Sequence, residues 1–286
     1  MNMQTSRMPA LFIGHGSPMN TLELNGFTRA WRSLGEKLPK PRAILVVSAH
    51  WFIGATAVTA MARPRTIHDF YGFPKTLFDF EYPADGSPEV AGEVVEAVKP
   101  DWVGLDHDQW GLDHGTWSVL AHLYPKANIP VVQVSINAHK PFEYHIALAT
   151  RLSSLRDKGV LVLSSGNVVH NLGLVEWNRP TEGADWAHRF DEAVMRQMAE
   201  DPAAILKLNQ HPDFARSVPT PDHYIPLLYT AGIAAAEGRS QPLIRGYSLG
   251  SLSMTSYNVG PELSLPATAE GISEMPGNVP ADQTNI

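Results

Sequence analysis

Three histidines of this chain each follow a short segment of aliphatic and β-branched residues. They are His15, His50 and His170, which follow residues 9–13, 43–47 and 159–163. Such apolar runs are typical of buried parallel strands, and ligands bind outside the carboxyl ends of strands in open α/β sheets. Because neutral imidazole is a common metal ligand, the pattern predicts a metal site built from these three side chains.

Two further histidines are candidates for the same site. His223 lies between prolines at the predicted start of a helix over about 222–236, which Asp222 is expected to cap. His114 follows Asp113, which can orient the imidazole or cap a turn. An imidazole that titrates near neutral pH is a natural general acid–base. We expect the other histidines considered to be surface or structural residues: His107, His122, His139, His145, His188 and His211.

The composition limits which metals and ligands are plausible. The chain has 12 histidines and no cysteine, so a transition-metal site must use imidazole and carboxylate. Three or four neutral imidazoles suit Zn²⁺, or Fe²⁺ with open coordination positions. The lack of cysteine also excludes disulfides and iron–sulfur clusters and fits a reducing compartment, so we expect a cytoplasmic protein.

Charge and hydropathy argue against two classes of partner. The net charge is −7 and no cluster of Lys and Arg is present, so no nucleic acid is expected as a partner. No apolar run is long enough to span a bilayer, and no secretory signal is recognisable. A membrane partner is therefore not expected, and no pattern indicates an oligomeric state.

The order of elements predicts an α/β fold. Besides the strands before the histidines, we expect strands at 55–60 and 129–136 and a hairpin or edge strand within 247–258. Helices are predicted over 26–36, 87–98, 116–123, 141–157, 184–199, 202–208 and 222–236, where Ser87 and Pro88 give a cap and a proline at the first helical position. We expect one domain over residues 1–262 and a flexible tail over 263–286.

Residues 63–86 form a long segment without helical or strand periodicity. It contains many aromatic residues punctuated by Gly and Pro. A loop of this length inside a domain is usually functional, so we expect a rim or lid over the site. The alternative is a surface excursion packed by its own aromatic side chains.

Several of these segments together resemble a known superfamily. Over residues 9–258 the chain is similar to class III extradiol ring-cleaving dioxygenases, and within them to the DOPA 4,5-dioxygenase-like branch. The matching motifs are Gly14-His15-Gly16-Ser17-Pro18, Ser48-Ala49-His50-Trp51, Ile67-His68-Asp69-Phe70-Tyr71-Gly72-Phe73-Pro74, Leu112-Asp113-His114-Gly115-Thr116-Trp117, Ser165-Gly166-Asn167-Val168-Val169-His170-Asn171-Leu172 and Asp222-His223-Tyr224-Ile225-Pro226-Leu227.

The resemblance implies a fold and a reaction. The fold would be a single domain with a central mixed, largely parallel sheet flanked by helices. The reaction would be the opening of a catechol ring beside its diol by O₂, with a divalent metal chelated by both catechol oxygens. His15 and His50 would be metal ligands, and His223 matches the third ligand. His170 matches a fourth ligand or an acid–base group, and His114 matches a second acid–base group.

One departure bears on the metal and on rival functions. Iron dioxygenases typically use two histidines and one carboxylate. Here His223 takes the third place, and an all-histidine site also suits Zn²⁺; Asp222 or Asp113 could still supply an oxygen.

The substrate is expected to be a DOPA-like catechol, and basic residues near 63–75 are candidates for binding a carboxylate on it. Two alternatives are a zinc hydrolase with Asp113 or His114 as the base, and a non-catalytic binding module.

Overall fold

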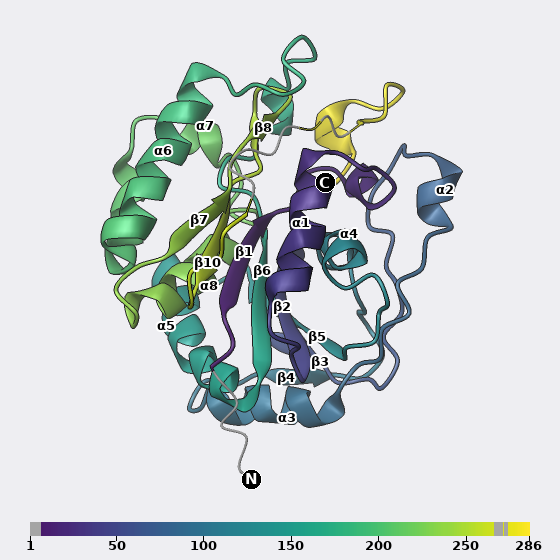
Figure 1. The fold of residues 1–286 in the computed structure, drawn as a ribbon, viewed down its shortest axis with the longest axis vertical. Helices are drawn as coiled ribbons and strands as arrows, with labels where there is room; N and C mark the ends of the chain where they lie inside the picture. The colour runs from purple at the N-terminus through teal and green to yellow at the C-terminus, as the bar shows by residue number, and fades with distance from the viewer. Residues whose placement is uncertain (1–6, 266–270, 272–273) are drawn as a thin grey trace.

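The centre of the protein is an eight-stranded sheet in the order β4-β3-β5-β2-β6-β1-β10-β7 (Figure 1). This computed structural model describes residues 7–265, 271 and 274–286. The strands are β1 (Ala10–Gly14), β2 (Ala43–Ile53), β3 (Ala57–Thr59), β4 (Gly104–Asp106), β5 (Val131–Asn137), β6 (Val160–Gly166), β7 (Gln241–Ile244) and β10 (Ser256–Val259). A separate small sheet pairs β8 (Tyr247–Ser248) with β9 (Leu252–Ser253).

The sheet is mixed, and its middle is parallel. β5, β2, β6 and β1 run parallel to one another. β10 and β7 add antiparallel strands beyond β1, and β3 pairs antiparallel with β5 on the other side. The predicted α/β fold with a largely parallel mixed sheet is confirmed.

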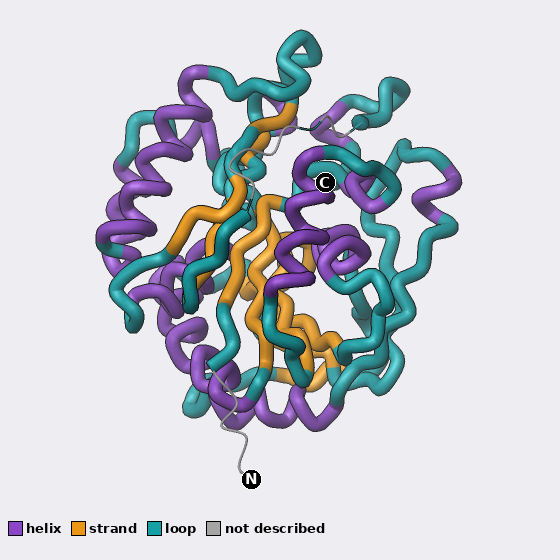
Figure 2. The backbone as a smooth tube through the Cα atoms, viewed as in Figure 1, coloured by secondary structure: helices purple, strands orange, loops and turns teal. Residues whose placement is uncertain are grey.

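The apolar strands are continuous because both faces of the sheet are buried. Successive residues of β6 enter different cores: Val160 and Val162 pack in one, and Leu161 and Leu163 in the other. Parallel strands covered on both faces read as unbroken apolar runs for this reason. Figure 2 shows helices on both sides of the strands.

The helices divide between the two faces. α1 and α4 pack together on one face, while α5 and α8 pack together on the other (Figure 1). The helices are α1 (Gly26–Lys37), α2 (Lys75–Phe78), α3 (Pro88–Ala97), α4 (His114–Leu123), α5 (Phe142–Leu152), α6 (Asp185–Glu200), α7 (Phe214–Ser217) and α8 (Ile225–Ala235). Ser87 caps α3 with Pro88 in its first turn, as predicted.

Three sequence predictions about helices were wrong in detail. α5 ends at Leu152 and continues as a 3₁₀ helix over Ser153–Lys158, and Pro202–Gln210 is also 3₁₀ rather than α-helical. Asp222 does not cap α8, whose N-cap position is Tyr224. The Asp222 carboxylate instead accepts a hydrogen bond from the ring of His223, the next residue in the chain.

Strand β2 is longer than its apolar run. We predicted a strand over 43–47 with His50 beyond its end, but β2 continues through His50 to Ile53. Its pairing with β5 shifts register between Val47 and Phe52. Such an irregularity re-aims side chains, and His50 lies inside it.

The described part of the predicted tail lies against the domain. Thr284 and Ile286 are buried, at 0% and 2% exposed. The single-domain boundary at 262 and the flexibility of the tail stay predictions, and residues 266–270 and 272–273 of that tail lie outside the described residues.

Within the described chain, no helix has the length and apolarity needed to cross a membrane.

A buried histidine between helices α5 and α8 predicts a pH-dependent stability. Burial lowers the pKa of His145 to about 4, and its Nδ1 lies 3.2 Å from the Tyr229 hydroxyl. In the unfolded chain His145 takes up a proton near pH 6.5. The contribution of neutral His145 to the free energy of unfolding is therefore fully present above that pH and is lost as the pH falls towards about 4.

The free energy of unfolding should fall in both proteins when the pH drops from about 7.5 to about 5. We expect the fall in His145→Gln to be smaller than that in the wild type by up to about 2 kcal/mol. Urea unfolding of both proteins at the two pH values, with the same metal content, measures this difference. Equal losses in the two proteins would contradict the assignment.

Candidate metal centre

The fold brings all five candidate histidines together. His15 follows the end of β1, His50 lies in β2, and His170 follows β6 by a short turn. His114 is the first residue of α4, and His223 precedes Tyr224, the N-cap of α8. The ring of His15 lies 5.1 Å from that of His50 and 5.4 Å from that of His223, between centroids.

The closest contact in the group joins two imidazole nitrogens. The Nε2 atoms of His15 and His50 are 3.1 Å apart. Two nitrogens at this distance can share a cation bound at about 2.0–2.1 Å from each. His15, His50 and His114 each offer a nitrogen, and these atoms all lie within 4.8 Å of one another, so this group could hold a metal ion.

The protonation of His15 follows from its neighbour Ser165. The Ser165 hydroxyl donates to the carbonyl of Gly115 at 2.5 Å. It therefore accepts from His15 Nδ1, which lies 3.0 Å away. With its proton on Nδ1, His15 presents the lone pair of Nε2 towards His50, as a metal ligand requires.

His223 is oriented in the same manner by a carboxylate. Its Nδ1–H donates to Asp222, and its Nε2 is buried without a hydrogen-bond partner. Burial acts to raise the pKa of Asp222, but the charge and hydrogen bond of His223 lower it below its usual value. His170 stacks on His223 with ring centroids 3.6 Å apart.

The Asp69 carboxylate contacts the rings of His50 and His114, a role that the sequence analysis did not identify. Its Oδ2 lies 3.3 Å from His50 Nδ1 and its Oδ1 lies 3.0 Å from His114 Nδ1. The backbone N–H of His114 also donates to Oδ1. The motif Ile67–Pro74 that contains Asp69 was recognised, but no role for its carboxylate was deduced.

Burial favours the neutral form of three histidines of the site. Burial lowers the pKa of His15, His50 and His170 well below the usual value, and the charges of neighbouring histidines lower it further. A neutral imidazole keeps a lone pair for a metal or a proton. The buried, unpartnered Nε2 of His223 and the facing Nε2 atoms of His15 and His50 therefore fit a divalent cation.

Two glycines allow the elements to approach this closely. A Cβ on Gly115 would lie 2.5 Å from Ser48 Oγ and 2.9 Å from His50 Cδ2. A Cβ on Gly166, at the end of β6, would lie 2.3 Å from the carbonyl oxygen of His223. Side chains at these positions would displace His50 and His223.

A pocket of about 600 Å³ opens beside the histidines. His50, His170 and His223 line it, together with Ala49, Phe52, Asn171, Leu172, Gly173, Pro219, Thr220, Asp222, Asp282, Asn285 and Ile286. A cavity of this size accommodates a small organic ligand. None of these residues is Lys or Arg, so the basic residues near 63–75 do not line this pocket.

The structure decides two alternatives that the sequence left open. Asp113 caps α4 by accepting from the Thr116 N–H, and it also accepts from Ser48 Oγ, so it does not orient His114. The aromatic loop contributes no residue to the pocket wall. Its Phe70 is buried and packs against His114 from behind, with a centroid distance of 5.6 Å.

Comparisons with known proteins agree with this geometry. Residues 8–258 match the family model described as the catalytic LigB subunit of aromatic ring-opening dioxygenase. The chain is 47% identical over 262 residues to 4,5-DOPA dioxygenase extradiol of Escherichia coli (strain K12), covering 90% of this chain and 97% of the relative. It is 32% identical over 284 residues to 4,5-DOPA dioxygenase extradiol of Beta vulgaris, covering 90% and 98%.

A solved structure has the same fold. The crystal structure of an uncharacterized protein from Escherichia coli K12 matches with a TM-score of 0.77 and 44% sequence identity. The match covers 89% of this chain and all of the other, at 100%. The comparisons favour ring-opening dioxygenation over the zinc hydrolase alternative.

The contacts of Asp69 predict a role in orienting histidines. We expect Asp69→Ala to lower ring-opening activity by about 10- to 100-fold, because carboxylates that contact metal-site histidines typically have effects of this size. Asp79→Ala is the matched control, since Asp79 is an exposed carboxylate of the same loop. Steady-state kinetics on folded, metal-loaded proteins measure the effect, and equal activities of the two variants would contradict it.

Proposed function

This chain belongs to the family of the catalytic LigB subunit of aromatic ring-opening dioxygenase and is an extradiol dioxygenase, and we propose that it opens the ring of a DOPA-like catechol at a divalent metal, Fe²⁺ or Zn²⁺. The observation that carries this proposal is the convergence of buried histidine nitrogens around His15 and His50, beside the pocket. The donors are imidazole nitrogens, which suit either ion.

We propose His15, His50 and His223 as the residues that hold the metal. His15 and His223 have their Nδ1 protons directed at Ser165 and Asp222, which leaves Nε2 as the donor atom. The unpartnered Nε2 of His223 supports its inclusion. When bound, the metal would acidify the catechol and bring it and O₂ together.

The remaining two histidines are proposed to handle protons. Both ring nitrogens of His114 are buried without a hydrogen bond of good geometry. Its ring can therefore accept the proton of a catechol hydroxyl and return it to the opened product. His170 lines the pocket and stacks on His223, a position compatible with an acid–base group or a fourth ligand.

The substrate class rests on the relatives and on the pocket. The relatives are named for DOPA, a catechol with an amino-acid side chain. The pocket is lined by apolar and polar residues and two aspartates, Asp222 and Asp282. A cytoplasmic location is proposed as well, since a chain without cysteine suits a reducing compartment.

Anaerobic loading of the metal-free protein with Fe²⁺ tests the reaction. Addition of L-DOPA and air is expected to consume O₂ and to give a yellow ring-opened semialdehyde, whereas Zn²⁺ gives no O₂ uptake because it is redox-inert. A loaded Fe²⁺ protein that turns over no catechol would contradict the proposal. Zinc-dependent ester or amide hydrolysis without O₂ uptake would restore the hydrolase alternative.

Metal content separates the two roles proposed for the histidines. We expect His223→Ala to lose most of its bound metal after dialysis. His114→Ala should keep the metal and slow turnover by about 10²- to 10⁴-fold, the usual contribution of a general acid–base. Elemental analysis and kcat measure the two effects. Loss of metal from His114→Ala with retention in His223→Ala would assign the third ligand to His114.

A further inference from the structure

The last residues of the chain reach the site from outside the family match. Residues 274–286 lie beyond the matched residues 8–258. The Tyr71 N–H donates to the carbonyl of Thr284 at 3.0 Å, and the Asn285 side chain donates to the carbonyl of Asp69. Ile286 and His170 line the same pocket. The segment therefore contacts residues that line or support the histidine group.

The same segment is also held at its beginning and middle. Ser17 Oγ donates to the carbonyl of Glu274 at 2.8 Å, and the Glu274 N–H donates to Glu23 at 3.2 Å. Gly72 has a φ of +82°, and a Cβ on it would lie 2.5 Å from Val279. These contacts fix a path for residues 274–286 across one side of the domain.

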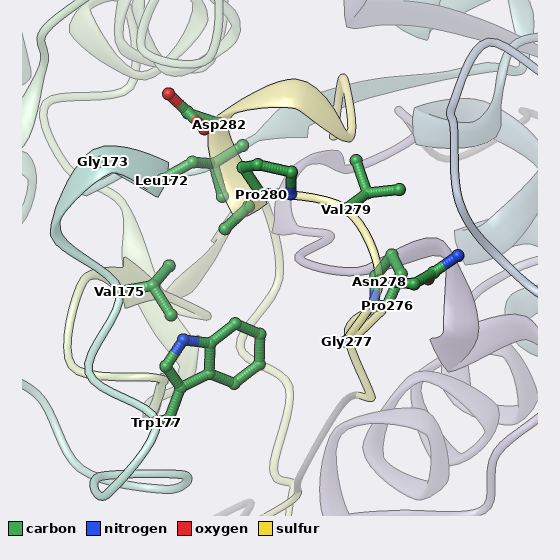
Figure 3. Close-up of a pocket in the computed structure, with 11 residues that line it drawn as sticks. Leu172, Gly173, Val175, Trp177, Pro276, Gly277, Asn278, Val279, Pro280 and Asp282 are labelled. Atoms are coloured by element: carbon green, nitrogen blue, oxygen red, sulfur yellow. The ribbon is translucent and has the colours of Figure 1, made fainter.

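The segment separates two cavities. Asp282, Asn285 and Ile286 belong to the lining of the pocket of about 600 Å³. A neighbouring cavity of about 730 Å³ lies between residues 172–177 and 276–282 (Figure 3). Both cavities share Leu172, Gly173 and Asp282.

Figure 3 shows Leu172 beside Pro280 and Asp282 at the neighbouring cavity. Since Leu172 and Asp282 also line the pocket of about 600 Å³, the chain there lies between the two. The short 3₁₀ helix Leu172–Leu174 contacts the 3₁₀ helix Ala281–Gln283 at this point. Without residues 274–286, the pocket beside His170 would lose this wall and join the neighbouring space.

We propose that residues 274–286 form a wall of the substrate pocket that limits the size of the ring substituent the enzyme accepts. The inference rests on the proposed function in taking a catechol as the occupant. With the diol at the histidines, the lining left for a substituent is Ala49, Phe52, residues 171–173, 219–220 and 222, and Asp282, Asn285 and Ile286 of this segment. A wall discriminates by excluding a bulky substituent through steric overlap.

The test compares one small and one bulky catechol, 4-methylcatechol and 4-tert-butylcatechol. The proteins are the full chain, a chain ending at residue 273, Ile286→Ala, and Gln283→Ala as the control. Gln283 is exposed in the same segment and lines neither cavity. All are loaded with Fe²⁺ to the same measured occupancy.

We expect the ratio of kcat/KM for the bulky over the small catechol to rise about tenfold on truncation, the scale on which pocket contacts discriminate. Ile286→Ala should raise it about threefold and Gln283→Ala should leave it unchanged. A ratio unchanged in both the truncated chain and Ile286→Ala, or an equal loss for both catechols, would overturn the proposal.

A binding measurement keeps this test separate from the reaction itself. 4-Nitrocatechol is bound to each protein without O₂ and displaced by the two catechols, and the ratio of their dissociation constants is compared. If the full chain turns over neither these catechols nor L-DOPA, the proposed function fails, while a shifted binding ratio still supports the wall. If the truncated chain does not fold, Ile286→Ala and Asn285→Ala decide the outcome.

Discussion

The structure depends on two imidazole nitrogens that face each other in a buried site. The hydrogen bond with Ser165 places the proton of His15 on Nδ1, and when His50 carries its proton on Nδ1, beside Asp69, both Nε2 atoms present lone pairs 3.1 Å apart. Facing lone pairs repel, and burial prevents relief by protonation because it lowers the pKa of both rings. A shared cation removes the repulsion, which is why a metal centre explains this arrangement better than a structural cluster.

The surrounding residues support that contact by holding the opposite sides of the rings. Ser165 takes the Nδ1 proton of His15, and Asp222 takes that of His223. Partners of this kind set the tautomer and direction of a metal-binding imidazole. Gly166 completes the arrangement, since only a residue without a Cβ lets the end of β6 lie against the carbonyl of His223.

Five strands of the sheet were predictable from the sequence, β1, β2, β3, β5 and β6, and β1, β2 and β6 begin with continuous apolar runs because both faces of the sheet are buried. The same pattern placed His15 and His170 correctly at strand ends, where parallel neighbours bring them together. It could not reveal that β2 continues through His50, because a register irregularity changes pairing without changing composition. Local pattern left Asp113 open between a cap and a partner of His114, and it is the cap. Local pattern misassigned Asp222, which orients His223 and does not cap α8.

Contacts between distant parts of the chain were beyond the reach of such patterns. Asp69 and Asn285 are 216 residues apart, and neither lies in a periodic element. Yet Asn285 binds the carbonyl of Asp69, and the carboxylate of Asp69 contacts His50 and His114.

The wall of the pocket and the histidines behind it are therefore joined through one residue. A substituent that displaced Asn285 would disturb the backbone of Asp69, and with it the orientation of two imidazoles. Contiguous contacts of this kind can carry energetic coupling between sites. The size of the substrate would then be linked to the orientation of the two imidazole rings. A catechol that fits poorly would bind more weakly and would also be turned over more slowly.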